Sequence, residues 1–441
     1  MGLNLSPADR LLLAMTLVQA AAALCAWFTS DRAGRWAVFA AQAVAAALAA
    51  RLQPGGGLRP ASALGPGAAW LAVILGVGLT VTAYRLWESP EARSEGDGHR
   101  YNALLALLLA VVAAVPFAGS GLRLWLSVEA VTFLMALLID VERRPQSVEA
   151  AWKLYILSAA GSLVALLGTA LAEGSAQPAL ALTLLAVGYG AKAGLVPLYL
   201  WKPDAYAATS ATTGALLASL ESLVGLYAIA WWVPRLGVSS APSWPLLLLG
   251  GLSLLMAALA LPAERDPRKA LAYSTVEQAA LAVLALAAGG PAGPLLAFWL
   301  TLNNAAAKPL AFFTLGRPGA ARWLYALALL TLAGVPPMNV FFGELALFRT
   351  LGAFRPLLLA GVLALLVPIF IGLVRLVTVA LFPAPQPESQ AAGEASPLSW
   401  SAALASAVHL LAVLALGAAG LPLAVLGGAV LGAAGLGGGL L

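Results

Sequence analysis

The sequence consists almost entirely of apolar runs of about 20 residues, the length that a helix needs to cross a bilayer. Of its 441 residues, 61% are hydrophobic and only 10% are charged, a balance that soluble domains do not have. Backbone polar groups within lipid must be paired inside the protein, which favours helices. The sequence therefore predicts an all-α polytopic membrane protein with about fourteen transmembrane helices.

Apolar runs and the turn residues between them set the predicted spans. The first seven are expected at 8–28, 35–51, 68–87, 101–118, 122–141, 150–172 and 178–201. The next seven are expected at 210–233, 244–262, 270–288, 293–315, 322–351, 356–382 and 398–418. The glycine-rich tail 421–441 is expected to form a short re-entrant or surface helix rather than a fifteenth span.

Two of these spans contain glycine and proline interruptions. They are Gly190, Gly194 and Pro197 in the seventh span, and Gly334, Pro336 and Pro337 in the twelfth. Proline removes a backbone donor, and a membrane tolerates the break only where protein or water pairs the freed groups. Paired interruptions five helices apart indicate an inverted repeat with transport groups near the breaks.

The predicted organisation has four parts. They are 1–100 with three N-terminal helices, 101–233 as the first inverted five-helix repeat, 244–382 as the second, and 398–441 with the last helix and the tail. In this arrangement Lys192 and Glu344 occupy roughly corresponding places.

The bias of lysine and arginine between alternate loops predicts the orientation. With the N-terminus outside, inner segments carry fourteen of these residues, Lys202 among them, and outer segments carry seven. Both termini are therefore expected outside.

Cysteine and histidine are too scarce for a redox or metal centre. Cys25 is the single cysteine, and the two histidines, His99 and His409, lie far apart, which argues against iron–sulfur, haem and zinc sites. The net charge of +5 is spread over short loops and does not indicate nucleic acid. If redox chemistry powers this protein, the electrons run through other subunits.

Among the charged side chains within predicted spans, the main candidates are Glu129, Lys192, Lys308 and Glu344. A charge at the bilayer centre costs about 2.5–3.5 kcal/mol on insertion scales, and the default reason to keep one is ion or proton movement. The four residues therefore predict a hydrated row of groups that carries protons through the membrane interior.

Glu129 and Lys192 are expected to pair, because a lone buried charge is strongly disfavoured. The pair can exist as carboxylate and ammonium or as two neutral groups, and the two forms differ by one moved proton. The alternative is a static ion pair that fixes helix packing. Lys308 lies near mid-span with Asn303 and Asn304 about one turn before it; the alternative there is an ammonium that reaches the interface.

Other ionisable groups are further candidates. Glu344 is expected to be the last group before the outer face, to accept hydrogen bonds from the amides of the broken helix, or both. Glu221 in LLASLESLVGL and Glu277 in YSTVEQAALAV are carboxylates within spans, open to either a proton-transfer or a structural role. Lys153 in VEAAWKLY is a candidate near the interface.

Five regions of the sequence resemble the antiporter-like proton-channel subunits of respiratory complex I and of energy-converting membrane hydrogenases of the formate hydrogenlyase type. In the family's order, over about residues 100–380, they are RLWLSVEAVTFLMALL with VEAAWKLYILSAAGS, GAKAGLVPLYLWKPDAYAATSATTGALLAS, RDPRKALAYSTVEQ, LNNAAAKPLAFFTLG and LAGVPPMNVFFGELALF.

The resemblance implies that Glu129, Lys192, Lys308 and Glu344 form an axis across mid-membrane, with proton input from the cytoplasm and exit to the outside. The sequence departs from the family in three places. Asn304 stands where histidine is usual, Lys202 stands where leucine is commoner, and the eighth helix has Glu221 in place of a lysine or histidine. These departures leave open a subunit whose coupling is altered or partly lost.

These observations predict a proton-translocating subunit of a redox-driven complex, either membrane hydrogenase or NADH/quinone oxidoreductase-like. The chain itself is expected to bind no cofactor, with iron–sulfur clusters in soluble partner subunits and with other membrane subunits beside it. Its expected location is the inner membrane of a bacterium or archaeon. The alternatives are a subunit of a multisubunit Na⁺/H⁺ antiporter, a structural subunit with a decayed proton path, and a carbon-uptake complex with a zinc protein.

Overall fold

The computed structural model describes residues 7–50, 66–87, 97–174, 177–237, 243–288, 293–382 and 406, and every regular element within them is a helix. The all-α architecture predicted from the sequence is confirmed. The last predicted span, 398–418, and the tail 421–441 lie outside the described residues, apart from Ser406.

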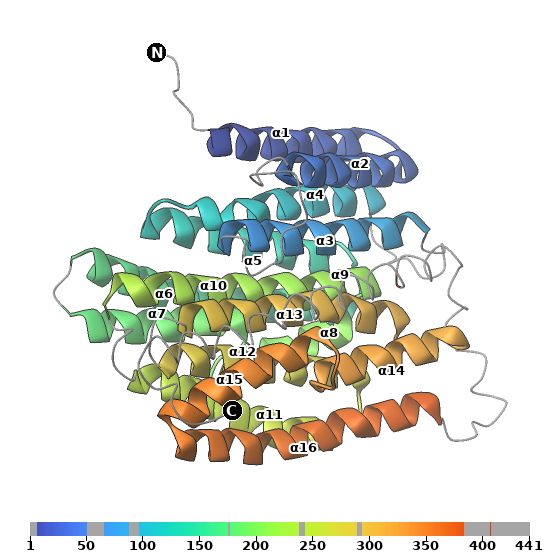
Figure 1. Cartoon of the computed structure of the whole chain (residues 1–441). Helices are drawn as coiled ribbons and strands as arrows, with labels where there is room; N and C mark the ends of the chain where they lie inside the picture. The colour runs from blue at the N-terminus through green and yellow to red at the C-terminus, as the bar shows by residue number, and fades with distance from the viewer. Residues whose placement is uncertain are drawn as a thin grey trace.

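The helices lie roughly parallel, and chain order carries them from α1 at one end of the molecule to α16 at the other (Figure 1). The first group is α1 (Pro7–Phe28), α2 (Asp31–Ala50), α3 (Pro66–Trp87), α4 (Gly98–Ala114) with the 3₁₀ turn η3 (Val115–Phe117), α5 (Gly121–Asp140) and α6 (Pro145–Glu173). The second group is α7 (Pro178–Ala193), α8 (Trp201–Ala208), α9 (Ala211–Leu216), the π-helical turn η4 (Leu217–Glu221), α10 (Ser222–Arg235) and α11 (Trp244–Ala263). The third group is α12 (Pro267–Ala287), α13 (Gly293–Thr314), α14 (Ala320–Leu332), α15 (Asn339–Phe354) and α16 (Pro356–Leu381).

Several helices begin where the sequence offers a capping side chain. Asp97, Ser120, Ser210 and Asp266 each precede a helix and accept hydrogen bonds from N–H groups of its first turn. These N–H groups have no partner within the helix, so the caps stabilise the helix starts.

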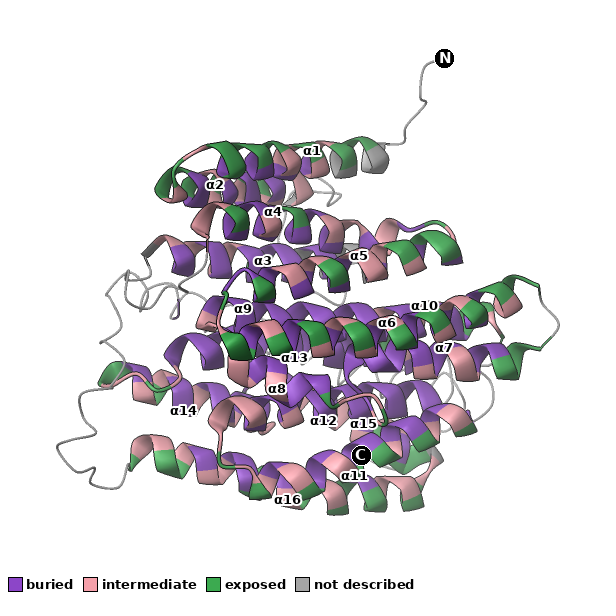
Figure 2. Ribbon diagram, turned by 180° about the vertical axis from the view of Figure 1, so that it is seen from behind, coloured by how far each residue is buried: buried purple, intermediate pink, exposed green. Residues whose placement is uncertain are grey.

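Burial is concentrated in the middle of the stack, around α12 and α13, and the outermost helices are exposed (Figure 2). Of the residues in the most apolar stretch of α12, 94% are buried, against 22% of those in the corresponding stretch of α16. The exposed side chains of α16 are large and apolar, among them Leu357, Ile371 and Val379. Exposed apolar faces of this size mark contact with lipid or with other membrane subunits.

Seven described helices are long and apolar enough to cross a membrane. They are Gly98–Phe117, Gly121–Asp140, Pro145–Glu173, Ala211–Arg235, Trp244–Ala263, Pro267–Ala287 and Pro356–Leu381. Four shorter apolar helices accompany them, namely Leu13–Phe28, Val73–Leu86, Pro178–Ala193 and Ala320–Leu332. The chain is therefore a polytopic membrane protein, and the total of about fourteen spans stays a prediction.

The two predicted interruptions are confirmed, and they share one local geometry. After α7, Gly194 takes a left-handed φ of 70°, and after α14, Gly334 takes a left-handed φ of 66°. In both places the N–H of the following residue returns to a carbonyl five residues back, Leu195 to Gly190 at 2.8 Å and Val335 to Leu330 at 3.1 Å. This is the Schellman ending, which favours glycine.

The second interruption divides the predicted span 322–351 into two helices, whereas the first ends the predicted span 178–201 at Ala193, and the next helix lies almost wholly beyond that span. The chain resumes as α8 at Trp201 and as α15 at Asn339, with cis peptide bonds at Val196–Pro197 and Pro336–Pro337 in between. The inverted-repeat relation and the four-part division remain predictions.

Candidate functional site

The first charged cluster joins α5, α6 and α7. Lys192 Nζ lies 2.8 Å from Glu129 Oε2, and Ser162 on α6 donates a hydrogen bond to the same carboxylate oxygen. Lys192 is fully buried, whereas 22% of the Glu129 side chain is exposed at the edge of the chain. The predicted pair is thus in contact. The sequence predicted that both charges would be buried, but the Glu129 carboxylate is partly exposed in this chain.

Small residues bring α6 and α7 close enough to build this cluster. A Cβ on Gly188 would lie 2.4 Å from the backbone nitrogen of Ala165, and a Cβ on Gly161 would lie 2.4 Å from Ala191 Cβ. Helices in membranes use such residues to let their backbones approach. The close approach places Ser162, next to Gly161, and Lys192, next to Ala191, around one carboxylate.

Thr132 extends the cluster to a second carboxylate. Its hydroxyl accepts a hydrogen bond from Lys192 Nζ at 2.9 Å and donates one to Glu221 Oε1 at 2.5 Å. Thr132 lies three residues after Glu129 on α5, so both side chains share a helix face. Glu221 closes the π-helical turn η4, and such turns frequently occur at functional sites. The other Glu221 oxygen has no protein hydrogen-bond partner among the described residues.

Lys202 lies in the interior, and its placement in an inner loop by the sequence analysis was wrong. The side chain is completely buried. Its ammonium donates to the carbonyl of Ala193, the last residue of α7, and to Ser222 Oγ at 2.7 Å. The physical reason is the break itself: α8 begins at Trp201 inside the helical stack, so its first turn faces buried neighbours.

Lys308 occupies the middle of α13 without an acidic partner in contact. Its ammonium donates to the carbonyl of Leu271 on α12 at 2.9 Å, and within the described ranges no carboxylate forms an ion pair with it. Pro309 follows it and cannot donate to the carbonyl of Ala305. Ser219 pairs that carbonyl instead, at 2.8 Å. Lys308 is fully buried, so the alternative of an ammonium that reaches the interface is wrong.

Glu277 and Glu344 are joined through one amide. The Nε2 atom of Gln278 donates to Glu277 Oε1 at 2.9 Å and to Glu344 Oε1 at 2.7 Å. Glu344 also packs on the second break, because a Cβ on Gly334 would lie 2.3 Å from Glu344 Oε2. Two carboxylates from α12 and α15 therefore meet at Gln278.

The clusters form one continuous series. Lys202 interacts electrostatically with both Glu221 and Lys308, and Lys308 does so with Glu277. We call the series the buried row; in order it contains Glu129, Lys192, Glu221, Lys202, Lys308, Glu277 and Glu344.

Polar atoms without protein partners lie along the buried row. They include one oxygen each of Glu221, Glu277, Gln278 and Asn304, considering the described residues. Buried polar atoms of this kind need hydrogen-bond partners, and internal water commonly supplies them. The buried row is therefore polar enough to be hydrated.

Lys153 lies at the rim instead of in the buried row. It contacts Glu149 at 2.7 Å and Asp204 at 2.8 Å, and 43% of its side chain is exposed. Lys269 approaches Asp204 at 3.6 Å. These groups line a cavity of about 250 Å³. Asp204 belongs to α8, as does Lys202, so α8 connects the rim cavity with the buried row.

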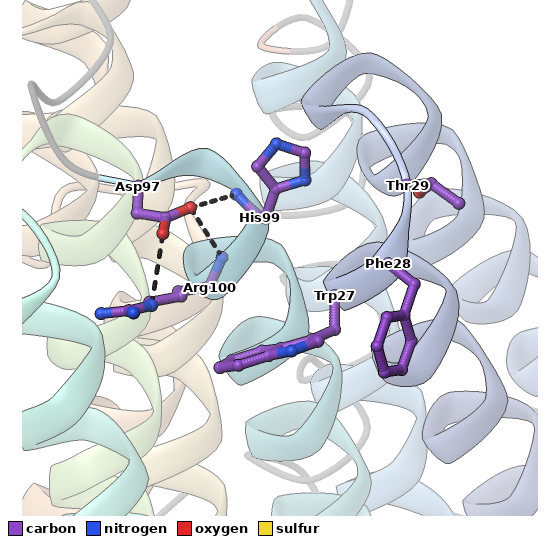
Figure 3. Close-up of a pocket in the computed structure, with 6 residues that line it drawn as sticks. All are labelled: Trp27, Phe28, Thr29, Asp97, His99 and Arg100. Atoms are coloured by element: carbon purple, nitrogen blue, oxygen red, sulfur yellow. Dashed lines mark hydrogen bonds and ion pairs between the residues drawn. The ribbon is translucent and has the colours of Figure 1, made fainter.

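A second cavity, of about 320 Å³, lies away from the buried row where α1 ends and α4 begins. Figure 3 shows the Asp97 carboxylate turned toward Arg100 and toward the start of α4, with the Arg100 guanidinium over the Trp27 ring. The Asp97 carboxylate caps the first turn of α4. No group of three or more His, Cys, Asp or Glu within the described ranges could hold a metal ion.

Sequence reasoning missed Lys202, Thr132 and Gln278. Thr132 carried a usable signal, because it follows Glu129 by three residues on one predicted helix. Gln278 stands directly after a candidate carboxylate. Lys202 gave no such signal, since its burial depends on where the chain turns after the break.

Comparison with known proteins finds one matching family and several relatives. The transmembrane family Proton_antipo_M, described as NADH:quinone oxidoreductase/Mrp antiporter, matches residues 118–318. The hydrogenase-4 component F homolog of Methylacidiphilum infernorum is 30% identical over 303 residues, covering 58% of this chain and 63% of the relative. The NADH-quinone oxidoreductase subunit N of Geotalea uraniireducens is 28% identical over 360 residues, covering 71% and 76%. The chain spans less than two thirds of the length of several relatives. It covers 63% of the hydrogenase-4 component F homolog and 44% of two uncharacterized Mycobacterium tuberculosis proteins.

Solved structures share the fold. The archaeal membrane-bound sulfane sulfur reductase matches with a TM-score of 0.79 at 19% identity, over 96% of both chains. The Mrp complex from Dietzia sp. DQ12-45-1b matches with a TM-score of 0.76 at 19% identity, over 95% of this chain and 96% of the other. Respiratory complex I from Thermus thermophilus gives 0.72 at 23% identity, over 92% and 96%.

The chain therefore shares its fold with chains of these three membrane complexes. Over the matched residues, the chain is similar to antiporter-like subunits of the type found in complex I, membrane hydrogenases and Mrp-type complexes. The resemblance stated from the sequence is confirmed.

Proposed function

We propose that the chain translocates protons as a membrane subunit of a redox-driven complex, of the membrane hydrogenase or NADH/quinone oxidoreductase kind. The observation that carries the proposal is the buried row. It links titratable groups from α5 to α15 through hydrogen bonds, one ion pair and electrostatic contacts. Groups buried in this way are expensive in a membrane, and a chain keeps them for ion or proton movement.

The first step of transfer uses the Glu129–Lys192 pair. When the proton moves from the Lys192 ammonium to the Glu129 carboxylate, both groups become neutral and the pair opens. The Thr132 hydroxyl can accept from Lys192 while it donates to Glu221. Once Lys192 is protonated again, its ammonium can give a proton to the Thr132 hydroxyl while this hydroxyl releases its own proton to the Glu221 carboxylate, which leaves a neutral amine and a protonated Glu221.

Coupling to redox chemistry requires other subunits. We propose that soluble partners hold iron–sulfur clusters and that their electron transfer changes the charge at one end of the buried row. Against a potential of 100 mV each proton costs about 2.3 kcal/mol. Leaving one charge of a buried ion pair without its partner costs about 3–5 kcal/mol, which is of the same order as the cost of moving one proton.

The location follows from the same proposal. We place the chain in the inner membrane of a bacterium or archaeon, with both termini outside. The turn between α1 and α2 then faces the cytoplasm. A Thr29→Cys variant in a Cys25→Ser background tests this in intact cells with a membrane-impermeant maleimide. No labelling is expected before the membrane is opened, and labelling of intact cells would reverse the orientation.

Proton pumping by the assembled complex in vesicles tests the function. Lys192→Ala and Glu129→Gln should both abolish pumping and leave the complex assembled. Matched controls are Arg235→Ala and Glu173→Gln, which change exposed charges at the ends of α10 and α6. Unchanged pumping in Lys192→Ala would remove this lysine from the mechanism. A loss of assembly without a change in pumping per complex would favour a packing role for the pair.

A second candidate is a subunit of a Na⁺/H⁺ antiporter without a redox arm. The family description and the Mrp complex structure favour it. The two functions differ in what drives transport. Proton movement in response to a sodium gradient, in vesicles without an electron donor, would support the antiporter. Pumping that depends on electron transfer would support the redox-driven complex.

A further inference from the structure

We propose that Lys202 is a proton-relay residue that joins the two halves of the buried row; this inference rests on the proposed function. The first half contains Glu129, Lys192 and Glu221, and the second half contains Lys308, Glu277 and Glu344. Without Lys202, the row would pass from Glu221 directly to Lys308. With it, the row gains an ammonium that interacts electrostatically with both groups and that contacts Ser222, the neighbour of Glu221 in sequence. Lys202 is completely buried, and within the described residues no carboxylate forms an ion pair with it.

The break after α7 gives Lys202 its space. A Cβ on Gly194 would lie 2.2 Å from Lys202 Cε and 2.7 Å from Lys202 Nζ. Gly194 is therefore required twice, once for its left-handed φ of 70° and once for the lysine stem that packs on it. A larger residue at this position would push the ammonium away from Ala193 and Ser222.

The second break holds an ionisable group in the same manner. Glu344 packs on Gly334 as Lys202 packs on Gly194, with a Cβ on Gly334 only 2.3 Å from Glu344 Oε2. Both glycines end a helix with the same left-handed geometry. Each break thus presents a titratable side chain of the following helix to the buried row. Since Glu344 is already a member of the row, the shared arrangement points to the same role for Lys202.

The relay is chemically balanced in two steps. A protonated Glu221 carboxyl gives its proton to the neutral Lys202 amine, which yields a carboxylate and an ammonium. The Lys202 ammonium then gives a proton to the neutral amine of Lys308. The flexible four-carbon stem of lysine lets the nitrogen move between its partners. The Lys202 nitrogen donates to Ser222 Oγ at 2.7 Å, and Ser222 directly follows Glu221 in the sequence.

A structural role is the alternative, because Lys202 also pairs the free carbonyl at the end of α7. Three substitutions separate the two roles. Lys202→Gln keeps an N–H donor for this carbonyl but carries no proton, Lys202→Met removes the donor as well, and Lys202→His restores a group that titrates near neutral pH.

The experiment measures protons pumped per electron by the whole complex in proteoliposomes, with Lys192→Ala and Arg235→Ala in parallel. Lys202→Gln and Lys202→Met are expected to lower this ratio at least about tenfold, as loss of a positioned acid–base group does. Lys202→His should recover part of it. Electron transfer with an uncoupler and the amount of assembled complex should stay near those of the wild type.

Normal pumping by Lys202→Gln would overturn the relay and leave only the helix-capping role. If neither Lys202→Gln nor Lys202→His assembles, the residue is structural and the relay is likewise overturned. The reference variant separates this inference from the function on which it rests. If Lys192→Ala pumps normally, the proposed function fails; if Lys192→Ala stops pumping while Lys202→Gln does not, only the Lys202 relay fails.

Discussion

The two halves of the buried row hold their lysines in different ways. Lys192 has a carboxylate in contact at 2.8 Å, whereas Lys308 donates to a backbone carbonyl at 2.9 Å and contacts no described carboxylate. The acidic groups near Lys308 are joined to each other instead, through Gln278. The same residue types thus form a closed pair in one half and an open arrangement in the other.

This difference indicates what each half can do. A buried ion pair is costly to break because either charge left alone is poorly stabilised. A lysine that contacts only a carbonyl has no such partner to lose, so it can accept or release a proton with less rearrangement. We infer that the first half gates transfer by opening a pair and that the second half passes protons on.

The largest expected effect comes from removing either lysine. Lys192→Ala and Lys308→Ala should each lower pumping at least about a hundredfold, because each removes a positioned proton carrier. The two variants should also differ in whether a second substitution, of the neighbouring carboxylate, restores their thermal stability. Adding Glu129→Gln to Lys192→Ala removes an unpaired carboxylate and should restore thermal stability, whereas Glu277→Gln should not restore that of Lys308→Ala.

Double-mutant cycles on thermal unfolding of the complex measure this difference. The 129/192 pair should show a coupling of about 0.5–3 kcal/mol, as contacting charges do, and the 277/308 pair, which interacts without an ion-pair contact, a smaller coupling. Arg235→Ala, which alters an exposed cation, controls for charge in general. Equal couplings in both halves would show that the closed and open arrangements are not distinct.

A smaller effect is expected from Gln278, which belongs to the open half alone. Gln278→Leu removes the donor shared by Glu277 and Glu344 and should slow pumping about tenfold by interrupting acid–base transfer. Gln42→Leu is the matched control, since Gln42 is a buried glutamine on α2 outside the buried row. If both variants slow pumping equally, the cause is packing and the carboxylate bridge has no role.

Thr132 sharpens the comparison from the closed half. Thr132→Val keeps the shape and removes the hydroxyl between Lys192 and Glu221. The lost hydrogen bond corresponds to about 1 kcal/mol, so pumping should fall about fivefold. Thr132→Ser retains the hydroxyl and should pump like the wild type. A normal rate in Thr132→Val would mean that water bridges the two charged groups without the threonine.

Much of the fold and part of the site could be predicted from the sequence. Apolar runs and the glycine–proline clusters identified the helices and both breaks, because these features act locally through hydrophobicity and backbone geometry. The Glu129–Lys192 contact was predictable because a buried charge needs a partner.

Other features depended on tertiary structure. The exposure of Glu129 depends on which face of α5 the neighbouring helices leave uncovered. Lys202 follows a stretch that resembles an interface loop in sequence, and only the course of the chain after Gly194 places it in the interior. The open arrangement of Lys308 depends on its contact with the carbonyl of Leu271 on α12, which the sequence does not encode locally.

The smallest effect is expected at the rim, where Lys153 leads toward the buried row. Its neighbours Glu149, Asp204 and Lys269 line the same cavity and can exchange protons with water in its place. Exposed ion pairs of this kind contribute only about 0–1 kcal/mol.

Lys153→Ala should therefore change pumping less than about twofold, which a difference of under 0.5 kcal/mol allows, and added salt should reduce the difference further. Proton uptake measured at several ionic strengths checks this, with Lys192→Ala as the reference for a group inside the buried row. A tenfold loss in Lys153→Ala would make the rim cavity a single required input. The closed pair at Glu129 would then no longer be the step that controls proton flow, because the control would lie where protons first reach α8.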